Sequence, residues 1–205
     1  MDSELIRKQL ELGLISPDIL LSGTKLIDES SRNAGDYKDG NYLPFYYHLG
    51  KQLKSKNVYQ IGAKLGLVGA CFLKSCKTVE SWLAMNNDKT FTVQIITANL
   101  KLNTKYFNDI MPGPISCISF TDDILETEIP NAKKFSGFDL GFLTENFGEE
   151  KYLKHLNFLW KFLVPEGLLV ADYITEHDVF HEFCRVKNRE PIIFNTRYGV
   201  GIIQK

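Results

Sequence analysis

Short apolar runs alternate with segments of helical spacing along most of this chain. The runs predict strands at Val58–Ile61, Thr92–Thr97, Ile115–Phe120, Phe138–Leu143 and Leu168–Asp172. Helical spacing of apolar residues predicts helices at Leu43–Leu53, Leu67–Cys76 and Glu149–Val164, and a last helix that starts near Thr175. Strands that alternate with helices are typical of a parallel sheet joined by crossover connections.

The two ends of the chain have different patterns. Pro191–Asn195 and Tyr198–Gln204 are β-rich and joined by two residues, which predicts a terminal hairpin. Before residue 43 the pattern predicts a helix at Ser3–Leu12, a short helix after Ser16-Pro17 and a polar loop at Ser30–Asn41. We therefore expect an N-terminal helical extension and loop over residues 1–42 and one α/β domain over residues 43–205.

Charge and hydropathy exclude several classes of partner. The 205 residues carry 24 Lys+Arg and 25 Asp+Glu, so there is no net attraction for nucleic acid or anionic lipid. No signal sequence and no apolar run of about 18 residues is present. These features predict a cytoplasmic protein with no nucleic-acid partner and no membrane. Whether it forms a homo-oligomer stays open.

The four cysteines do not form a metal-binding or redox motif. Cys71, Cys76, Cys117 and Cys184 stand in apolar surroundings without CxxC spacing. We expect buried, reduced thiols.

A glycine turn follows the first predicted strand. Gln60-Ile61-Gly62 runs through Ala63-Lys64-Leu65 to Gly66, where the next helix begins. Glycines at such a turn let the backbone approach a ligand, and the helix N-terminus offers free amide groups. The turn lacks the GxxxxGK[ST] motif of phosphate-binding loops and the GxGxxG motif of nicotinamide dinucleotide domains. A phosphate-binding loop and a nicotinamide dinucleotide site are therefore both disfavoured.

Two later segments carry a family resemblance. Phe138–Asn146 and Leu163–Asp172 resemble the fourth-strand to fifth-strand unit of class I S-adenosylmethionine-dependent methyltransferases, and Tyr198–Ile203 resembles their antiparallel terminal strand. The similarity spans about residues 43–205 and is closest to small-molecule O-methyltransferases. It implies a Rossmann-like, doubly wound, mostly parallel seven-stranded sheet with helices on both faces, strand order 3-2-1-4-5-7-6 and an antiparallel last strand.

The resemblance also implies a site for S-adenosylmethionine. Gly62 and Gly66 would line the pocket, Asp122 and Asp123 would lie on the adenine side, and Thr144 would follow the fourth strand. Two positions depart from the family. Gln60 stands where an acidic residue is usual, and Asn99, after the predicted second strand, stands where a carboxylate usually binds the ribose. An amide accepts these hydroxyl hydrogen bonds without charge assistance.

Asp172 and His177 are the catalytic candidates. Metal-dependent members hold a divalent ion with acids after the fourth and fifth strands, where this chain has Thr144 and then Asp172. Asp172 alone matches, so a metal stays open. In a helix starting near Thr175, His177 and His181 would share a face. They could then bind a metal or act as a general base, or they could be surface histidines without a chemical role. His155 is expected on the surface.

Two functions follow from these residues. The first is an S-adenosylmethionine-dependent methyltransferase with a small-molecule, hydroxyl-bearing acceptor, favoured by the glycines and the acidic pair. The second is a catalytically degenerate methyltransferase-fold protein that serves as a binding or assembly module, favoured by Gln60 and Asn99. Fold alone does not decide between them.

Overall fold

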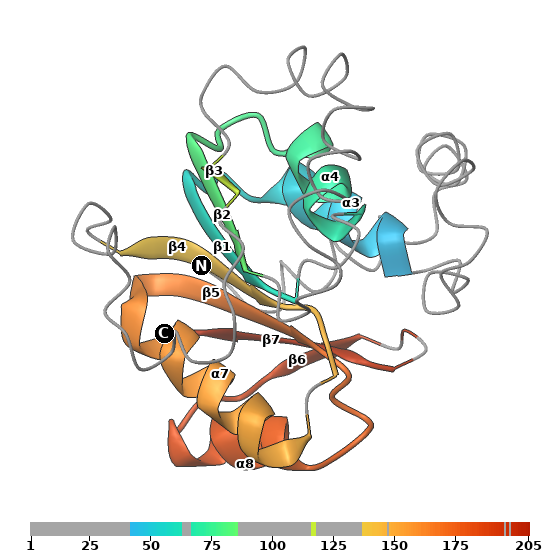
Figure 1. Ribbon diagram of the computed structural model, residues 1–205, viewed down its shortest axis with the longest axis vertical. Helices are drawn as coiled ribbons and strands as arrows, with labels where there is room; N and C mark the ends of the chain where they lie inside the picture. The colour runs from blue at the N-terminus through green and yellow to red at the C-terminus, as the bar shows by residue number, and fades with distance from the viewer. Residues whose placement is uncertain are drawn as a thin grey trace.

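A seven-stranded sheet with helices on both faces forms the part of the chain described by the computed structural model (Figure 1). This part comprises residues 42–62, 67–85, 116–117, 137–146, 148–194, 196 and 198–205. Its elements in chain order are α3 (Tyr42–Gln52), β1 (Asn57–Ile61), α4 (Leu67–Ser75), β2 (Ser81–Met85), β3 (Ser116–Cys117), β4 (Phe138–Leu143), α7 (Glu149–Phe162), β5 (Leu163–Asp172), α8 (Val179–Val186), β6 (Ile192–Phe194) and β7 (Val200–Gln204).

The strand order is β3-β2-β1-β4-β5-β7-β6, which confirms the predicted topology. Strands β3, β2, β1, β4 and β5 are parallel to their neighbours, and β7 pairs antiparallel with both β5 and β6. The order reverses between β1 and β4. In open α/β sheets, ligands bind beyond the carboxyl ends of the strands at such a switch point.

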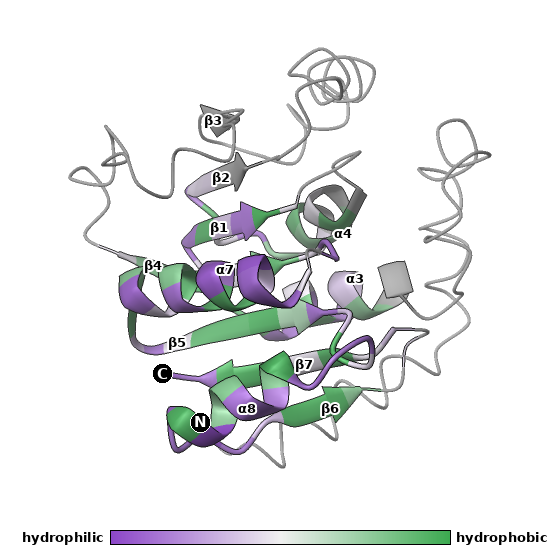
Figure 2. Cartoon of the chain, turned by 60° about the horizontal axis from the view of Figure 1, so that its bottom comes forward, coloured by the Kyte–Doolittle hydropathy of each residue, from purple (hydrophilic) through white to green (hydrophobic). Residues whose placement is uncertain are grey.

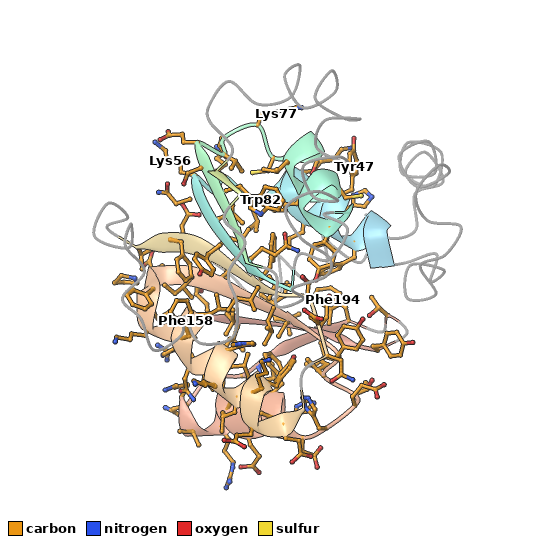
Figure 3. All side chains as sticks on the ribbon, in the orientation of Figure 1. Tyr47, Lys56, Lys77, Trp82, Phe158 and Phe194 are labelled. Carbon is orange, nitrogen blue, oxygen red and sulfur yellow. The ribbon has the colours of Figure 1, made fainter. Side chains whose placement is uncertain are left out.

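Helices α3 and α4 cover one face of the sheet, and α7 and α8 cover the other (Figure 1). Each face buries its own hydrophobic cluster. Side chains from α3 and α4 pack with Trp82 and Phe142 on the first face, and those from α7 and α8 pack with Leu169 on the second. Strand β5 is hydrophobic along most of its length (Figure 2), as expected for a strand covered on both faces. Trp82 and Phe158 mark the two layers in Figure 3.

The second strand differs from the prediction. The strand beside β1 is Ser81–Met85, so the assignment of this place in the sheet to Thr92–Thr97 is wrong; residues 92–97 lie outside the described part. Trp82 is buried and lies directly over Gly69 of α4, where an added Cβ would come within 2.8 Å of its ring. The backbone amides of Glu80 and Ser81 donate to the Lys56 carbonyl. These contacts fix the start of β2 a few residues after the end of α4.

Strand β5 begins earlier than predicted. Helix α7 ends at Phe162 rather than Val164, and Leu163 is already extended and pairs with Phe138. Pro165 cannot continue a helix, and the register shift after Phe138 takes up the extra residues of β5. Glu166, at a positive φ of 65°, lies within this irregular stretch. Residues 165–167, which lie between the predicted helix and the predicted strand, are therefore part of β5.

The last predicted helix starts later than Thr175. Helix α8 begins at Val179, because the preceding residues form a turn bonded to the hairpin. The Thr175 amide donates to the Tyr198 carbonyl (3.1 Å), and the Glu176 amide donates to the Tyr173 carbonyl (3.1 Å). His177 thus precedes the helix, and the prediction that it shares a helical face with His181 is wrong.

Several other predictions concern residues 1–41, which lie outside the described part. Among the described helices, none is long and apolar enough to cross a membrane. Cys71, Cys76 and Cys184 are buried thiols outside any disulfide of the described part, as expected. His155, expected on the surface, is buried instead.

Candidate functional site

Three buried polar side chains lie at the carboxyl ends of neighbouring strands. Gln60, Thr144 and Asp172 come from β1 and from the ends of β4 and β5, and they are 0%, 2% and 1% exposed. Ile61 pairs with Leu143, and Leu143 pairs with Ala171, so Gly62, Thr144 and Asp172 reach the same level of the sheet. Gln60 lies two residues before that level on β1. This polar row lies at the switch point and extends from it to β5.

Gln60 and Thr144 form a hydrogen-bonded unit across the switch point. The Gln60 Nε2 donates to Thr144 Oγ1 (2.8 Å), and the Thr144 hydroxyl lies 2.8 Å from the Gly62 carbonyl oxygen and 3.3 Å from that of Ile61. The Thr144 amide also donates to the Ile61 carbonyl (2.9 Å). Gln60 Oε1 is buried and accepts no hydrogen bond from the described residues. A buried acceptor without a partner costs free energy unless a ligand or water satisfies it.

Gly62 is required by the backbone of the turn. Its φ is +83°, and a Cβ there would meet Glu145, with the Glu145 amide nitrogen only 2.9 Å away. The glycine therefore permits close approach of the β4 end to the β1 turn. Gly66 lies outside the described residues.

Asp172 is held by two tyrosine hydroxyls from opposite layers. Tyr46 of α3 donates to the Asp172 carboxylate, and Tyr152 of α7 donates to the Asp172 main-chain carbonyl. Burial, together with the Asp172 charge, raises the pKa of the Tyr152 hydroxyl well above its usual value, so this hydroxyl stays protonated. We call Tyr46, Asp172 and Tyr152 the Asp172 clamp.

Sequence reasoning did not identify either tyrosine of the clamp as a site residue. Tyr46 belongs to the apolar positions that predict a helix at Leu43–Leu53, and it lies 126 residues from Asp172 in the sequence. The only available signal was a hydroxyl in an otherwise apolar stripe, since a buried phenol usually finds a partner. That signal does not say which partner.

His177 lies on the other side of the sheet from the Asp172 carboxylate. Its ring packs edge-on against Tyr152, with ring centroids 4.5 Å apart, in the layer of α7. Both ring nitrogens are shielded and form no hydrogen bond with the described residues. His181 is exposed on α8. The structure therefore does not bring Asp172, His177 and His181 together as one constellation.

The remaining predicted donor-site residues lie outside the described part. These are Gly66, Asn99, Asp122 and Asp123. The position of Asn99 was inferred from a second strand at residues 92–97, and β2 ends at Met85 instead. Asn99 itself lies outside the described part, so its place at the ribose stays a prediction.

No model of a protein family matches the chain, and no curated protein matches it. Solved structures do. A methyltransferase from Podospora anserina with bound S-adenosylhomocysteine is 13% identical, with 92% of this chain and 88% of that chain covered and a TM-score of 0.65. The O-methyltransferase of Streptomyces achromogenes involved in tomaymycin synthesis, in complex with S-adenosylmethionine, is 12% identical, with 92% and 90% covered and a TM-score of 0.65. A methyltransferase from Geobacter sulfurreducens is 17% identical, with 100% and 97% covered and a TM-score of 0.63.

These similarities establish the fold of the chain. It is the Rossmann-like fold of class I S-adenosylmethionine-dependent methyltransferases.

Proposed function

We propose that this protein is an S-adenosylmethionine-dependent methyltransferase that acts on a hydroxyl group of a small molecule. The observation that carries the proposal is the unsatisfied Gln60 acceptor beside the glycine turn at the switch point of a methyltransferase fold. The near-zero net charge of the sequence agrees with a small-molecule acceptor in the cytoplasm.

Gln60 and Gly62 are proposed to form part of the donor site. S-adenosylmethionine, when bound, supplies a methyl group already activated by its sulfonium, so the protein has mainly to orient the two substrates. Gln60 Oε1 would accept a hydrogen bond from an amino group of the donor. Thr144 would hold the Gln60 amide through its bond to Nε2. These roles fit a neutral side chain at a position where the family usually carries an acid.

The ribose position is proposed to follow β2. Parallel strands end at the same edge of a sheet, so residues directly after Met85 are better placed by topology than Asn99. The sequence after Met85 reads Asn86-Asn87-Asp88. Asp88 is the first carboxylate after β2 in the sequence and is proposed as the ribose ligand, and Gly66, Asp122 and Asp123 keep their proposed roles.

For proton transfer from the acceptor, His177 is the stronger candidate. Its ring nitrogens have no partner among the described residues, whereas the Asp172 carboxylate is bonded to Tyr46. A general base needs a free lone pair within reach of the hydroxyl proton. His177 lies in the α7 layer, so the acceptor hydroxyl is proposed to reach it past the end of β5, which Asp172 fixes.

A catalytically degenerate binding module is the second candidate. It is favoured by the mutual satisfaction of Gln60 Nε2 and Thr144, which gives the two residues a structural role that needs no ligand. The two functions differ in whether the donor binds.

Calorimetric titration with S-adenosylhomocysteine tests the proposal. The wild-type protein is expected to bind. Gln60→Met keeps the length of the side chain but removes both its acceptor and its Nε2 bond to Thr144. This variant is expected to bind roughly ten- to a hundredfold more weakly, since a hydrogen bond to a charged group is worth about 1.5–3 kcal/mol. Ser75→Ala is the matched control, because that hydroxyl bonds only to main-chain carbonyls of α4. Absence of binding by the folded wild type at millimolar ligand would support the module instead.

A further inference from the structure

The corner of the sheet at the end of β5 is where metal-dependent relatives would hold a divalent ion, and the Asp172 clamp occupies it. This question rests on the proposed function, because a metal there would serve the methyl acceptor. An ion at this corner would need oxygen ligands from the ends of β4 and β5.

Asp172 has already used part of its ligating capacity. Its carboxylate accepts the Tyr46 hydroxyl hydrogen bond, and both side chains are almost fully buried, at 1% and 0% exposed. Val170, two residues earlier on the strand, belongs to the hydrophobic cluster under α3 and α4, as does Tyr46. The carboxylate therefore faces an apolar layer of protein, and Tyr46 lies where an ion would need to approach.

The neighbouring strand ends do not complete a set of ligands. Thr144, at the end of β4, is bonded to Gln60 and the Gly62 carbonyl. Glu145 lies against Gly62, on the β1 side of β4, whereas Asp172 lies on the β5 side. Tyr173, which follows Asp172, stacks on Tyr198 with ring centroids 4.9 Å apart.

Hard divalent cations require several oxygen ligands, commonly more than one carboxylate or retained waters in an open site. Within the described ranges, no group of three or more His, Cys, Asp or Glu side chains is arranged to hold a metal ion. The residues present at this corner do not fit the ion.

We infer that the Tyr46 hydroxyl takes the place of a divalent ion at Asp172, so that the acceptor side of this protein is built without a metal. A phenol hydrogen bond then satisfies the buried carboxylate that an ion would neutralise in a metal-dependent relative. The bond also joins α3 to the end of β5, and Tyr152 holds the same residue from the opposite layer. The clamp thus fixes the strand end from both faces.

Manganese titration of the full chain tests the absence of the ion. Mn²⁺ is titrated calorimetrically into the wild type, into Asp172→Asn and, as a second carboxylate variant, into Glu145→Gln. In a separate experiment the thermal midpoint is measured in millimolar Mg²⁺ and in millimolar EDTA. The expected result is the same Mn²⁺ isotherm for the wild type and Asp172→Asn, and the same midpoint in both buffers. Saturable binding that Asp172→Asn removes would overturn the inference.

The Tyr46 bond is tested by urea unfolding. Tyr46→Phe is expected to lower the urea midpoint, because it leaves a buried carboxylate without one of its donors. Tyr47→Phe is the matched control, since this neighbour on the same helix is half-buried and its ring contacts His48 and Lys51 rather than Asp172. Equal midpoints for the two variants would contradict the clamp.

A titration with S-adenosylhomocysteine in EDTA separates this inference from the proposed function. Binding in EDTA together with equal Mn²⁺ isotherms supports both. If the donor analogue fails to bind in either buffer, the proposed function fails, and the Mn²⁺ comparison still decides the metal question. Donor binding that needs Mn²⁺ and Asp172 would overturn the inference alone.

Discussion

Gly62 has a conformation that an L-residue adopts only with strain. Its φ of +83° and the approach of Glu145 both oppose a side chain. We expect Gly62→Ala to lower the free energy of unfolding by about 2 kcal/mol or more, combining a left-handed backbone cost of about 1–2 kcal/mol with the steric conflict. Chemical denaturation of the variant and the wild type measures this difference in the free energy of unfolding. Gly148→Ala is the control, because nothing lies within 4 Å of the added Cβ.

His48 makes the stability of the fold depend on pH. Burial, and secondly the nearby Lys51 charge, lower its pKa below the ordinary value of 6.5. The unfolded chain therefore binds a proton at higher pH than the folded chain does, so stability falls as the pH drops below 6.5 and levels off below the lowered pKa. In unfolding curves measured across this range, His48→Phe should show a weaker pH dependence than the wild type.

Helix α7 is capped by a lysine from the far end of the chain. Lys205 Nζ donates to the carbonyls of Leu163 (2.6 Å), Trp160 (2.7 Å) and Lys161 (3.3 Å). A cation at a helix C-terminus satisfies free carbonyls and interacts favourably with the helix dipole. Lys205→Met should lower the free energy of unfolding by about 1 kcal/mol. Lys77→Met, at an exposed lysine, is the comparison, and an equal effect of the two would argue against capping.

Elements with a strong local pattern were predictable from the sequence, and those set by contacts were not. Strand β4 was predicted with its observed bounds because Phe138–Leu143 is a short run without charge or polarity except at Asp139. Strand β2 was missed because Ser81–Met85 lacks the β-branched residues typical of strands, and the Trp82 contact with Gly69 fixes its position. The start of α8 depended on hydrogen bonds to Tyr198, which no periodicity contains.

The same division applies to the candidate site. Gln60, Gly62, Thr144 and Asp172 were proposed from the resemblance to methyltransferases and from their places after predicted strands, whose ends the topology brings to one edge of the sheet. The bonding between them was not found. The Gln60 to Thr144 bond joins residues 84 apart in sequence, and its existence depends on the register of β1 against β4.

For the molecule as a whole, ligand linkage gives a test that does not require the methyl acceptor. A ligand that binds only the folded state stabilises it by about 2.7 kcal/mol at a hundredfold excess over the dissociation constant. For a chain of this size, S-adenosylhomocysteine should then raise the thermal midpoint by roughly 5–10 °C. Nicotinamide adenine dinucleotide should leave the midpoint unchanged in the same scanning fluorimetry, and the opposite ranking would point to a dinucleotide site.

Strand β7 lies between β5 and β6, although it follows both in sequence. Strand β6 is therefore joined to the sheet only through β7. A fragment that stops before Val200 would lack β7, would leave β6 without its pairing partner and would leave Leu168–Asp172 of β5 without its antiparallel neighbour. This stretch is apolar except for Asp172, and such an unpaired strand recruits strands from other chains. Truncation near the hairpin should thus produce aggregates rather than a smaller folded domain.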